Sequence, residues 1–305
     1  MLSQDCFNQA KESILLYARP LEKSILERYF NGGSNQQVLE ELIKFQNDDG
    51  GFGHGLESDF RLPYSSPMAT SVGLRLLSEI NDIEESYGMI KTSIAYLETS
   101  FDKKRNGWFA LTKEVNNFPH APWWHYKEDT GMTIIDLNWG NPSAEILGYL
   151  YKYREYVVNL NVDRLVEYAI TYLENKQEFN SENEIFCYIK FYEVLPDELK
   201  KRLEPRIAIA IEQVIVYDEQ EWYKYVPTPV DFLKTPSSNS FGVLESKLNI
   251  NLNFIVNQLD MHGRINPPWG ADYYKEDLKE AYHEWIGVLT LKALITLHHF
   301  KRIAV

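Results

Sequence analysis

The 305-residue sequence contains little cysteine and no long uninterrupted hydrophobic run. Its two cysteines, Cys6 and Cys187, provide neither a disulfide framework nor a CxxC metal motif, and both are expected to be structural. No apolar stretch approaches the ~20 residues of a membrane-spanning helix. The first residues also lack the basic and apolar regions of a signal peptide. These absences predict a cytoplasmic protein without a transmembrane segment.

Positive charge is scarce as well. The 31 Lys and Arg residues are outnumbered by 44 Asp and Glu residues, which gives a net charge of −13. Nucleic acids and anionic membranes bind to basic patches, so this balance argues against both as partners. Aromatic residues, at 14%, are instead plentiful. Large aromatic side chains fill protein cores, and they also form surfaces that bind sugars or polyprenyl chains.

Alternating strand patterns are rare, whereas apolar residues recur at helical spacing through most of the chain. In five places an amphipathic helix is expected to end, a polar loop follows, and a more apolar helix begins. These breaks lie near Gly50, Gly107, Ser181, Trp222 and Gly263. Repeated helix pairs are typical of solenoids and closed α/α rings, and a helix that is apolar all round is expected to be buried. We therefore predict an all-α protein that forms one α/α-toroid domain over residues 1–305. An irregular α-solenoid is the alternative.

The segment around the first break has the sequence LIKFQNDDGGF, from Leu42 to Phe52. It resembles the QW-type repeat of the terpenoid cyclase and protein prenyltransferase superfamily. In that repeat an aliphatic residue comes before a glutamine, and a glycine and an aromatic residue come after it. Asn106–Trp108 and Gln258–Ile265 resemble weaker copies. A glycine in the left-handed conformation can end the helix, and the aromatic residue can fold back over it. The resemblance implies an α/α toroid and an isoprenoid ligand.

The catalytic motifs of that superfamily are absent from this sequence. It contains no DxDD acid cluster, and Asp48-Asp49 runs into Gly50-Gly51-Phe52 instead of forming a DDxxD motif. No histidine follows Cys187 by three residues, so the zinc site of the prenyltransferases cannot be placed. The resemblance therefore predicts the fold and not a particular reaction. The sequence indicates no metal site, and it leaves cofactors and catalytic activity open.

Three long loops between helix pairs carry the candidate functional residues. In a ring of helix pairs these loops would open at the same end, so we expect them to converge on a ligand. Paired carboxylates and histidines can transfer protons, which makes Glu57, Asp59 and His125 the candidate catalytic residues. The side chains expected to contact a ligand are His54, Arg61, His120, Trp123, Trp124, Asp136, Trp139, Trp269, Asp272, Tyr273, His283 and Glu284.

Each of these groups also has a structural interpretation. Glu57 and Asp59 can bind Arg61 and help to cap the next helix. His120 and His125 can bind a metal, or they can hydrogen-bond to the loop backbone. The loop tryptophans can bind sugars or prenyl chains, or they can fill the ends of the core.

Three functions follow from these patterns. The first is an enzyme or enzyme-like binder on an α/α toroid, with a small-molecule ligand in a cavity formed by the long loops and an isoprenoid ligand implied by the resemblance. The second is a carbohydrate-active hydrolase or lyase on an α/α barrel, which the paired carboxylates and loop aromatics favour. The third is a scaffold that has kept the toroid without its chemistry.

Overall fold

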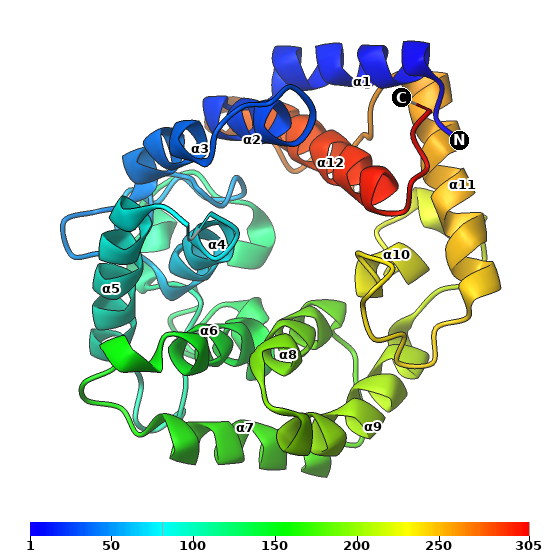
Figure 1. Cartoon of the computed structure of the whole chain (residues 1–305). Coiled ribbons are helices and arrows are strands. Elements are labelled where there is room, and N and C mark those ends of the chain that lie inside the picture. Colours follow the sequence, from blue (N-terminus) through cyan, green and yellow to red (C-terminus); the bar gives the residue numbers. More distant parts are fainter. Residues whose placement is uncertain (81, 305) are drawn as a thin grey trace. The chain divides into compact units, whose positions relative to one another are not determined.

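The computed structural model describes residues 1–80 and 82–304, and within them it contains twelve α-helices, short 3-10 helices and no β-strand (Figure 1). Pairing between extended residues is limited to isolated bridges in this part of the chain. The prediction of an all-α protein is confirmed. The residues group into two compact units, the central unit Leu42–Val214 and the terminal unit of Met1–Glu41 with Ile215–Val305. A single domain over residues 1–305 stays a prediction.

The central unit consists of two rows of helices. The first row is α4 (Pro67–Leu77), α6 (Gly140–Lys152) and α8 (Glu182–Val194). The second row is α5 (Glu84–Thr99), α7 (Val162–Asn175) and α9 (Asp197–Val214). Each helix of the first row packs against the helix that follows it, and α6 contacts both α4 and α8 (Figure 1). The unit is therefore built from three consecutive helix pairs.

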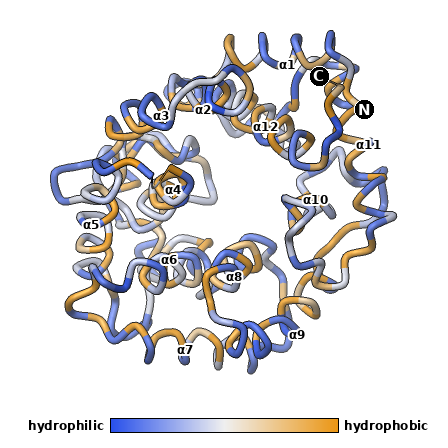
Figure 2. Tube along the Cα trace, in the orientation of Figure 1, coloured by the Kyte–Doolittle hydropathy of each residue, from blue (hydrophilic) through white to orange (hydrophobic). Residues whose placement is uncertain are grey.

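The two rows differ in burial, as the apolar patterns predict. Every residue of α6 from Gly140 to Leu150 is buried. By contrast, α7 buries one face, which carries Leu165, Ala169 and Leu173 among others. Figure 2 shows the corresponding alternation of hydrophilic and hydrophobic residues along α7. A helix that is enclosed on all sides needs small or apolar residues all round, whereas an outer helix needs only an apolar stripe.

The terminal unit contains the remaining helices. They are α1 (Gln4–Tyr17), α2 (Pro20–Phe30), α3 (Asn35–Leu42), α10 (Pro229–Phe232), α11 (Glu245–His262) and α12 (Lys279–His299), and α3 ends on the first residue of the central unit. The α1 helix packs against α2, α11 and α12. A parallel bridge between Leu2 and Ile303 holds the two ends of the chain together. The five predicted breaks fall before α4, α6, α8, α10 and α12.

A three-residue turn recurs at three of these breaks. It begins with a residue in the left-handed conformation: Gly50 (φ 87°), Asn106 (φ 51°) or Gly263 (φ 62°). Two residues later, a backbone N–H donates to a hydroxyl group on the next helix. The pairs are Phe52 with Thr70 at 3.0 Å, Trp108 with Ser143 at 2.9 Å, and Ile265 with Thr290 at 3.0 Å. The repeated geometry supports the interpretation of these segments as copies of one structural unit.

Gln46 ties the first copy to the neighbouring helix. Its Nε2 atom lies 2.9 Å from the carbonyl oxygen of Gly50 and 3.1 Å from that of Met89 in α5. A Cβ atom at Gly50 would lie 2.3 Å from the carbonyl oxygen of Thr92, so the turn requires glycine for space as well as for its positive φ. The glutamine and glycine of the LIKFQNDDGGF segment are thus explained by local packing.

Candidate functional site

Two of the three long loops meet within the central unit. Phe60 pairs with His120 in an antiparallel bridge. The backbone N–H of Ala121 donates to the carbonyl oxygen of Asp59 at 2.7 Å, and that of Arg61 donates to Pro119 at 2.8 Å. These bonds bring together Glu57, Asp59, His120, Trp123 and His125, which we term the two-loop cluster. The sequence predicted that all three long loops would converge, and these bonds bring the first two together.

Asp59 is the most enclosed polar side chain of the two-loop cluster, with 5% of its surface exposed. Its Oδ2 atom accepts a hydrogen bond from the indole N–H of Trp123 at 3.0 Å. Glu57 is half-buried, and its Oε1 atom lies 3.4 Å from the backbone N–H of Asp59. Behind them, the buried ring of Trp124 packs edge-on against Phe60, with ring centroids 5.2 Å apart. The carboxylate is therefore held against an indole ring that remains partly open to solvent.

The two histidines of the cluster form a stacked pair. Nδ1 of His120 lies 2.7 Å from the carbonyl oxygen of Phe118, and Nε2 of His120 lies 3.1 Å from Nδ1 of His125. A carbonyl oxygen only accepts, so His120 carries its proton on Nδ1. With that proton on Nδ1, Nε2 of His120 can accept a hydrogen bond from the Nδ1–H of His125. In this tautomer Nε2 of the exposed His125 keeps its lone pair, which is able to accept a proton.

Three other predicted ligand contacts lie in or beside these loops. His54 is exposed, and its Nε2 atom lies 2.7 Å from the side-chain oxygen of Asn47. Arg61 is half-buried next to the cluster. Trp124 is 6% exposed, and its indole N–H has no hydrogen-bond acceptor among residues 1–80 and 82–304. Whether these three side chains bind a ligand stays a prediction.

Asp136 and Trp139 belong to the second loop but are engaged by the protein itself. Asp136, at 2% exposure, accepts from the hydroxyl of Thr133 at 2.7 Å and from the backbone of Ala110 at 2.7 Å. Trp139, at 6% exposure, donates to the carbonyl oxygen of Arg105 at 3.1 Å. Asp136 and Trp139 therefore hold the second loop in place. These bonds do not support the prediction that the two side chains contact a ligand.

The third loop lies in the terminal unit. Its Trp269 indole donates to the hydroxyl of Tyr274 at 2.6 Å, and its ring packs edge-on against Trp285. Asp272 and Tyr273 are exposed. His283 lies 3.7 Å from the carboxylate of Glu280, and Glu284 lies 4.0 Å from the guanidinium of Arg19. Convergence of this loop with the two-loop cluster stays a prediction.

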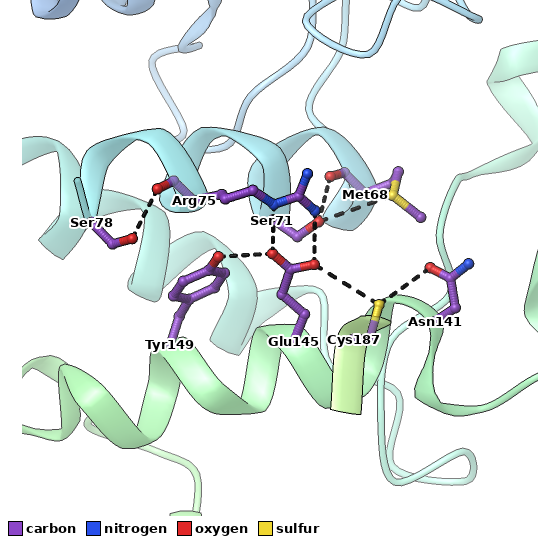
Figure 3. Close-up of polar contacts among 8 residues, drawn as sticks. All are labelled: Met68, Ser71, Arg75, Ser78, Asn141, Glu145, Tyr149 and Cys187. Atoms are coloured by element: carbon purple, nitrogen blue, oxygen red, sulfur yellow. Dashed lines mark hydrogen bonds and ion pairs between the residues drawn. The ribbon is translucent and has the colours of Figure 1, made fainter. Parts of the chain in front are cut away.

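A polar cluster that the sequence did not predict joins the first-row helices (Figure 3). Arg75 of α4 donates from Nε and Nη2 to the two carboxylate oxygens of Glu145 in α6, at 2.9 and 2.8 Å. The hydroxyl of Tyr149 donates to the same carboxylate at 2.8 Å, and the Cys187 sulfur of α8 lies 3.8 Å from it. The available signal was Arg75, the only charge in α4, and Glu145 in the middle of the apolar part of α6, because buried charges need partners.

The pKa values in this polar cluster of Arg75, Glu145, Tyr149 and Cys187 are shifted by burial and by neighbouring charges. Burial alone would raise the pKa of Glu145, but the positive charges of Arg75 and Lys190 and the hydrogen bonds lower it to about 2. Burial raises the pKa of the Cys187 thiol well above its ordinary value, and the negative charge of Glu145 raises it further. Cys187 is therefore a protonated thiol at neutral pH and a poor nucleophile, in agreement with its predicted structural role.

No family model, curated protein or solved structure matches this chain significantly. In the described part of the chain, no group of three or more Asp, Glu, His or Cys side chains is arranged to hold a metal ion. None of the helices formed by residues 1–80 and 82–304 combines the length and apolar character needed to cross a bilayer.

Proposed function

We propose that the protein is an enzyme-like binder of carbohydrate, with the two-loop cluster as its ligand site. The observation that carries this proposal is the contact between Asp59 and the Trp123 indole beside the His120–His125 pair. Sugars are bound by aromatic rings that cover their C–H faces and by carboxylates that accept hydrogen bonds from their hydroxyl groups. The two-loop cluster provides both kinds of contact.

The same cluster contains groups suited to acid–base chemistry. His125 offers the free Nε2 lone pair of the histidine pair as a base, and Glu57 and Asp59 are two carboxylates in different surroundings. Carboxylates whose environments differ can divide the roles of acid and base in the cleavage of a glycosidic bond. We propose these three residues as the catalytic groups of a hydrolase or lyase.

The resemblance to the terpenoid cyclase and prenyltransferase superfamily supports a second proposal, an α/α toroid with an isoprenoid ligand. Its structural support is the turn that recurs at Gly50, Asn106 and Gly263 and the rows of paired helices in the central unit. An isoprenoid chain requires an apolar surface, whereas the exposed and half-buried side chains of the two-loop cluster are mainly polar. The cluster therefore favours the carbohydrate.

A binding screen separates the two ligand classes. Neutral oligosaccharides and isoprenoid diphosphates would be tested by thermal shift and then by calorimetry. A ligand present at ten times its Kd adds about 1.4 kcal/mol to the free energy of unfolding. We expect stabilisation by an oligosaccharide, and its loss in Asp59→Asn and Trp123→Phe. Stabilisation by isoprenoid diphosphates alone would overturn the carbohydrate proposal.

Variants inside and outside the two-loop cluster test whether the ligand binds there. Glu128→Gln changes an exposed carboxylate in the second loop, and His262→Ala removes an exposed histidine at the end of α11. We expect both to bind the oligosaccharide as the unaltered protein does, whereas Glu57→Gln and His125→Ala weaken binding or abolish cleavage. Equal behaviour of all four variants would refute the assignment of the site.

A further inference from the structure

The guanidinium group of Arg75 has hydrogen-bonding capacity that the protein does not use. Arginine carries five N–H donors, and the pair with Glu145 uses one on Nε and one on Nη2. The Nη1 group points away from the carboxylate (Figure 3) and forms no hydrogen bond within residues 1–80 and 82–304. The side chain of Arg75 is 39% exposed, whereas that of Glu145 is 2% exposed. The outer edge of the guanidinium therefore keeps unused donors on a side chain that is partly exposed to solvent.

A second cation lies near the same carboxylate. Lys190 is half-buried on α8, one helical turn after Cys187. The Cys187 sulfur lies 3.8 Å from the Glu145 carboxylate, and residues three apart on a helix share a face, so Lys190 lies on the side of α8 that faces Glu145. In agreement with this position, its charge contributes to lowering the pKa of Glu145. In the described residues, Lys190 forms neither a hydrogen bond nor an ion pair within 4.0 Å. Its charge is therefore not neutralised by direct contact with the protein.

The charges around Glu145 leave a local excess of one positive charge. Arg75 and Lys190 contribute two, and Glu145 removes one. Glu184, whose negative charge also raises the pKa of Cys187, is already paired with Lys176. This excess is notable in a protein whose net charge is −13. One monoanionic group would balance it, whereas a diphosphate would bring more negative charge than the cluster can compensate.

We propose that Arg75 and Lys190 form a binding site for the carboxylate group of a small organic acid. The Nη1–H and the remaining Nη2–H of Arg75 form a fork that matches the two oxygens of a carboxylate. Lys190 supplies the second positive charge from the neighbouring α8 helix. Glu145 and Tyr149 hold the guanidinium in orientation, so the fork is fixed before the ligand arrives. This site is independent of the two-loop cluster.

The test uses benzoate as the carboxylate probe and benzamide as its neutral counterpart of the same shape. Binding to the full-length protein would be measured by saturation-transfer NMR and calorimetry at low salt. We expect benzoate to bind at one site, benzamide not to bind, and inorganic pyrophosphate to bind more weakly than benzoate. Absence of benzoate binding, or tighter binding of pyrophosphate, would overturn the proposal.

Three variants locate the site. Lys190→Gln removes a side chain without ion pairs, so folding is preserved, and we expect benzoate affinity to fall about tenfold. Arg75→Gln combined with Glu145→Gln replaces the ion pair by a neutral pair and should abolish binding. Lys91→Gln, an exposed lysine on α5, is the matched control and should leave affinity unchanged. Unaltered affinity in Lys190→Gln would refute the site even if the double variant fails to fold.

Discussion

At the scale of single residues, the pair of Arg75 and Glu145 is asymmetric. The carboxylate is almost fully enclosed, at 2% exposure, whereas the guanidinium side chain retains 39%. Removal of Glu145 leaves a cation that can be hydrated at its open edge. Removal of Arg75 leaves a buried carboxylate that has lost its closest compensating charge. The two halves of one ion pair therefore make unequal contributions to stability.

We predict that Arg75→Met lowers the free energy of unfolding by about 3–5 kcal/mol, because a buried charge loses its partner. Glu145→Gln should cost only about 1–2 kcal/mol, since the amide still accepts hydrogen bonds and the cation reaches water. Urea denaturation measures both values, and the double variant should recover part of the loss of Arg75→Met. A larger cost for Glu145→Gln would contradict this account.

Two glycines in helices of the central unit allow a matched comparison. A Cβ atom at Gly73 of α4 would lie 2.5 Å from the buried ring of Phe52, whereas nothing lies within 4 Å of a Cβ at Gly88 of α5. We predict that Gly73→Ala destabilises the protein by about 1–3 kcal/mol. Gly88→Ala should stabilise it by about 0.5–1 kcal/mol through helix propensity. Thermal unfolding of the two variants checks the opposite signs.

At the scale of elements, each copy of the three-residue turn is joined to the next helix by one hydroxyl group. Thr70, Ser143 and Thr290 are each 0% exposed, and each accepts a hydrogen bond from the backbone two residues after the left-handed position. A buried N–H without an acceptor is costly. The hydroxyl groups therefore fix how each amphipathic helix connects to its buried successor.

We predict that Thr70→Val, Ser143→Ala and Thr290→Val each lower the free energy of unfolding by about 1–3 kcal/mol, because the buried backbone donor is left unsatisfied. Thr171→Val, at an exposed position on α7, is the control and should change stability by less than about 0.5 kcal/mol. Chemical denaturation provides the values. Effects no larger than that of the control would show that these bonds do not hold the turns.

At the scale of the whole molecule, each unit contains a carboxylate whose pKa is lowered by a cationic partner. In the central unit it is Glu145, with a pKa of about 2 instead of 4.5. In the terminal unit, burial would raise the pKa of Asp231, but Lys292 and the hydrogen bonds from Thr228 lower it below 3.8. A carboxylate with a lowered pKa in the folded state stabilises the protein above the unfolded value and loses this effect as the pH falls.

We therefore predict that stability falls as the pH decreases from about 4.5 toward 2, the interval between the unfolded and folded pKa values of Glu145. Glu145→Gln and Asp231→Asn should each reduce the slope of stability against pH in this range. Asp163→Asn, which changes a carboxylate with 73% exposure, is the control and should not reduce it. Slopes that are the same in all variants would rule out these carboxylates as the source of acid sensitivity.

Much of the element order was predictable because helical periodicity is a local property. The breaks near Gly50, Gly107 and Gly263 follow from residues that favour a left-handed or turn conformation next to apolar helices. Convergence of all three long loops was predicted, since helix pairs in a ring bring their loops to one end, and the meeting of the first two agrees with it. The Arg75–Glu145 pair was not, because its members are 70 residues apart and sequence spacing gives no indication of their contact.

The sequence alone determined an all-helical protein with repeated helix pairs, because the spacing of apolar residues and the glycine turns act within a few residues of one another. Tertiary structure decided which polar residues meet. It set Asp59 against Trp123, stacked His120 on His125, and paired Arg75 with Glu145 while leaving one guanidinium edge open. Such contacts depend on how helices pack in three dimensions, which local periodicity does not specify.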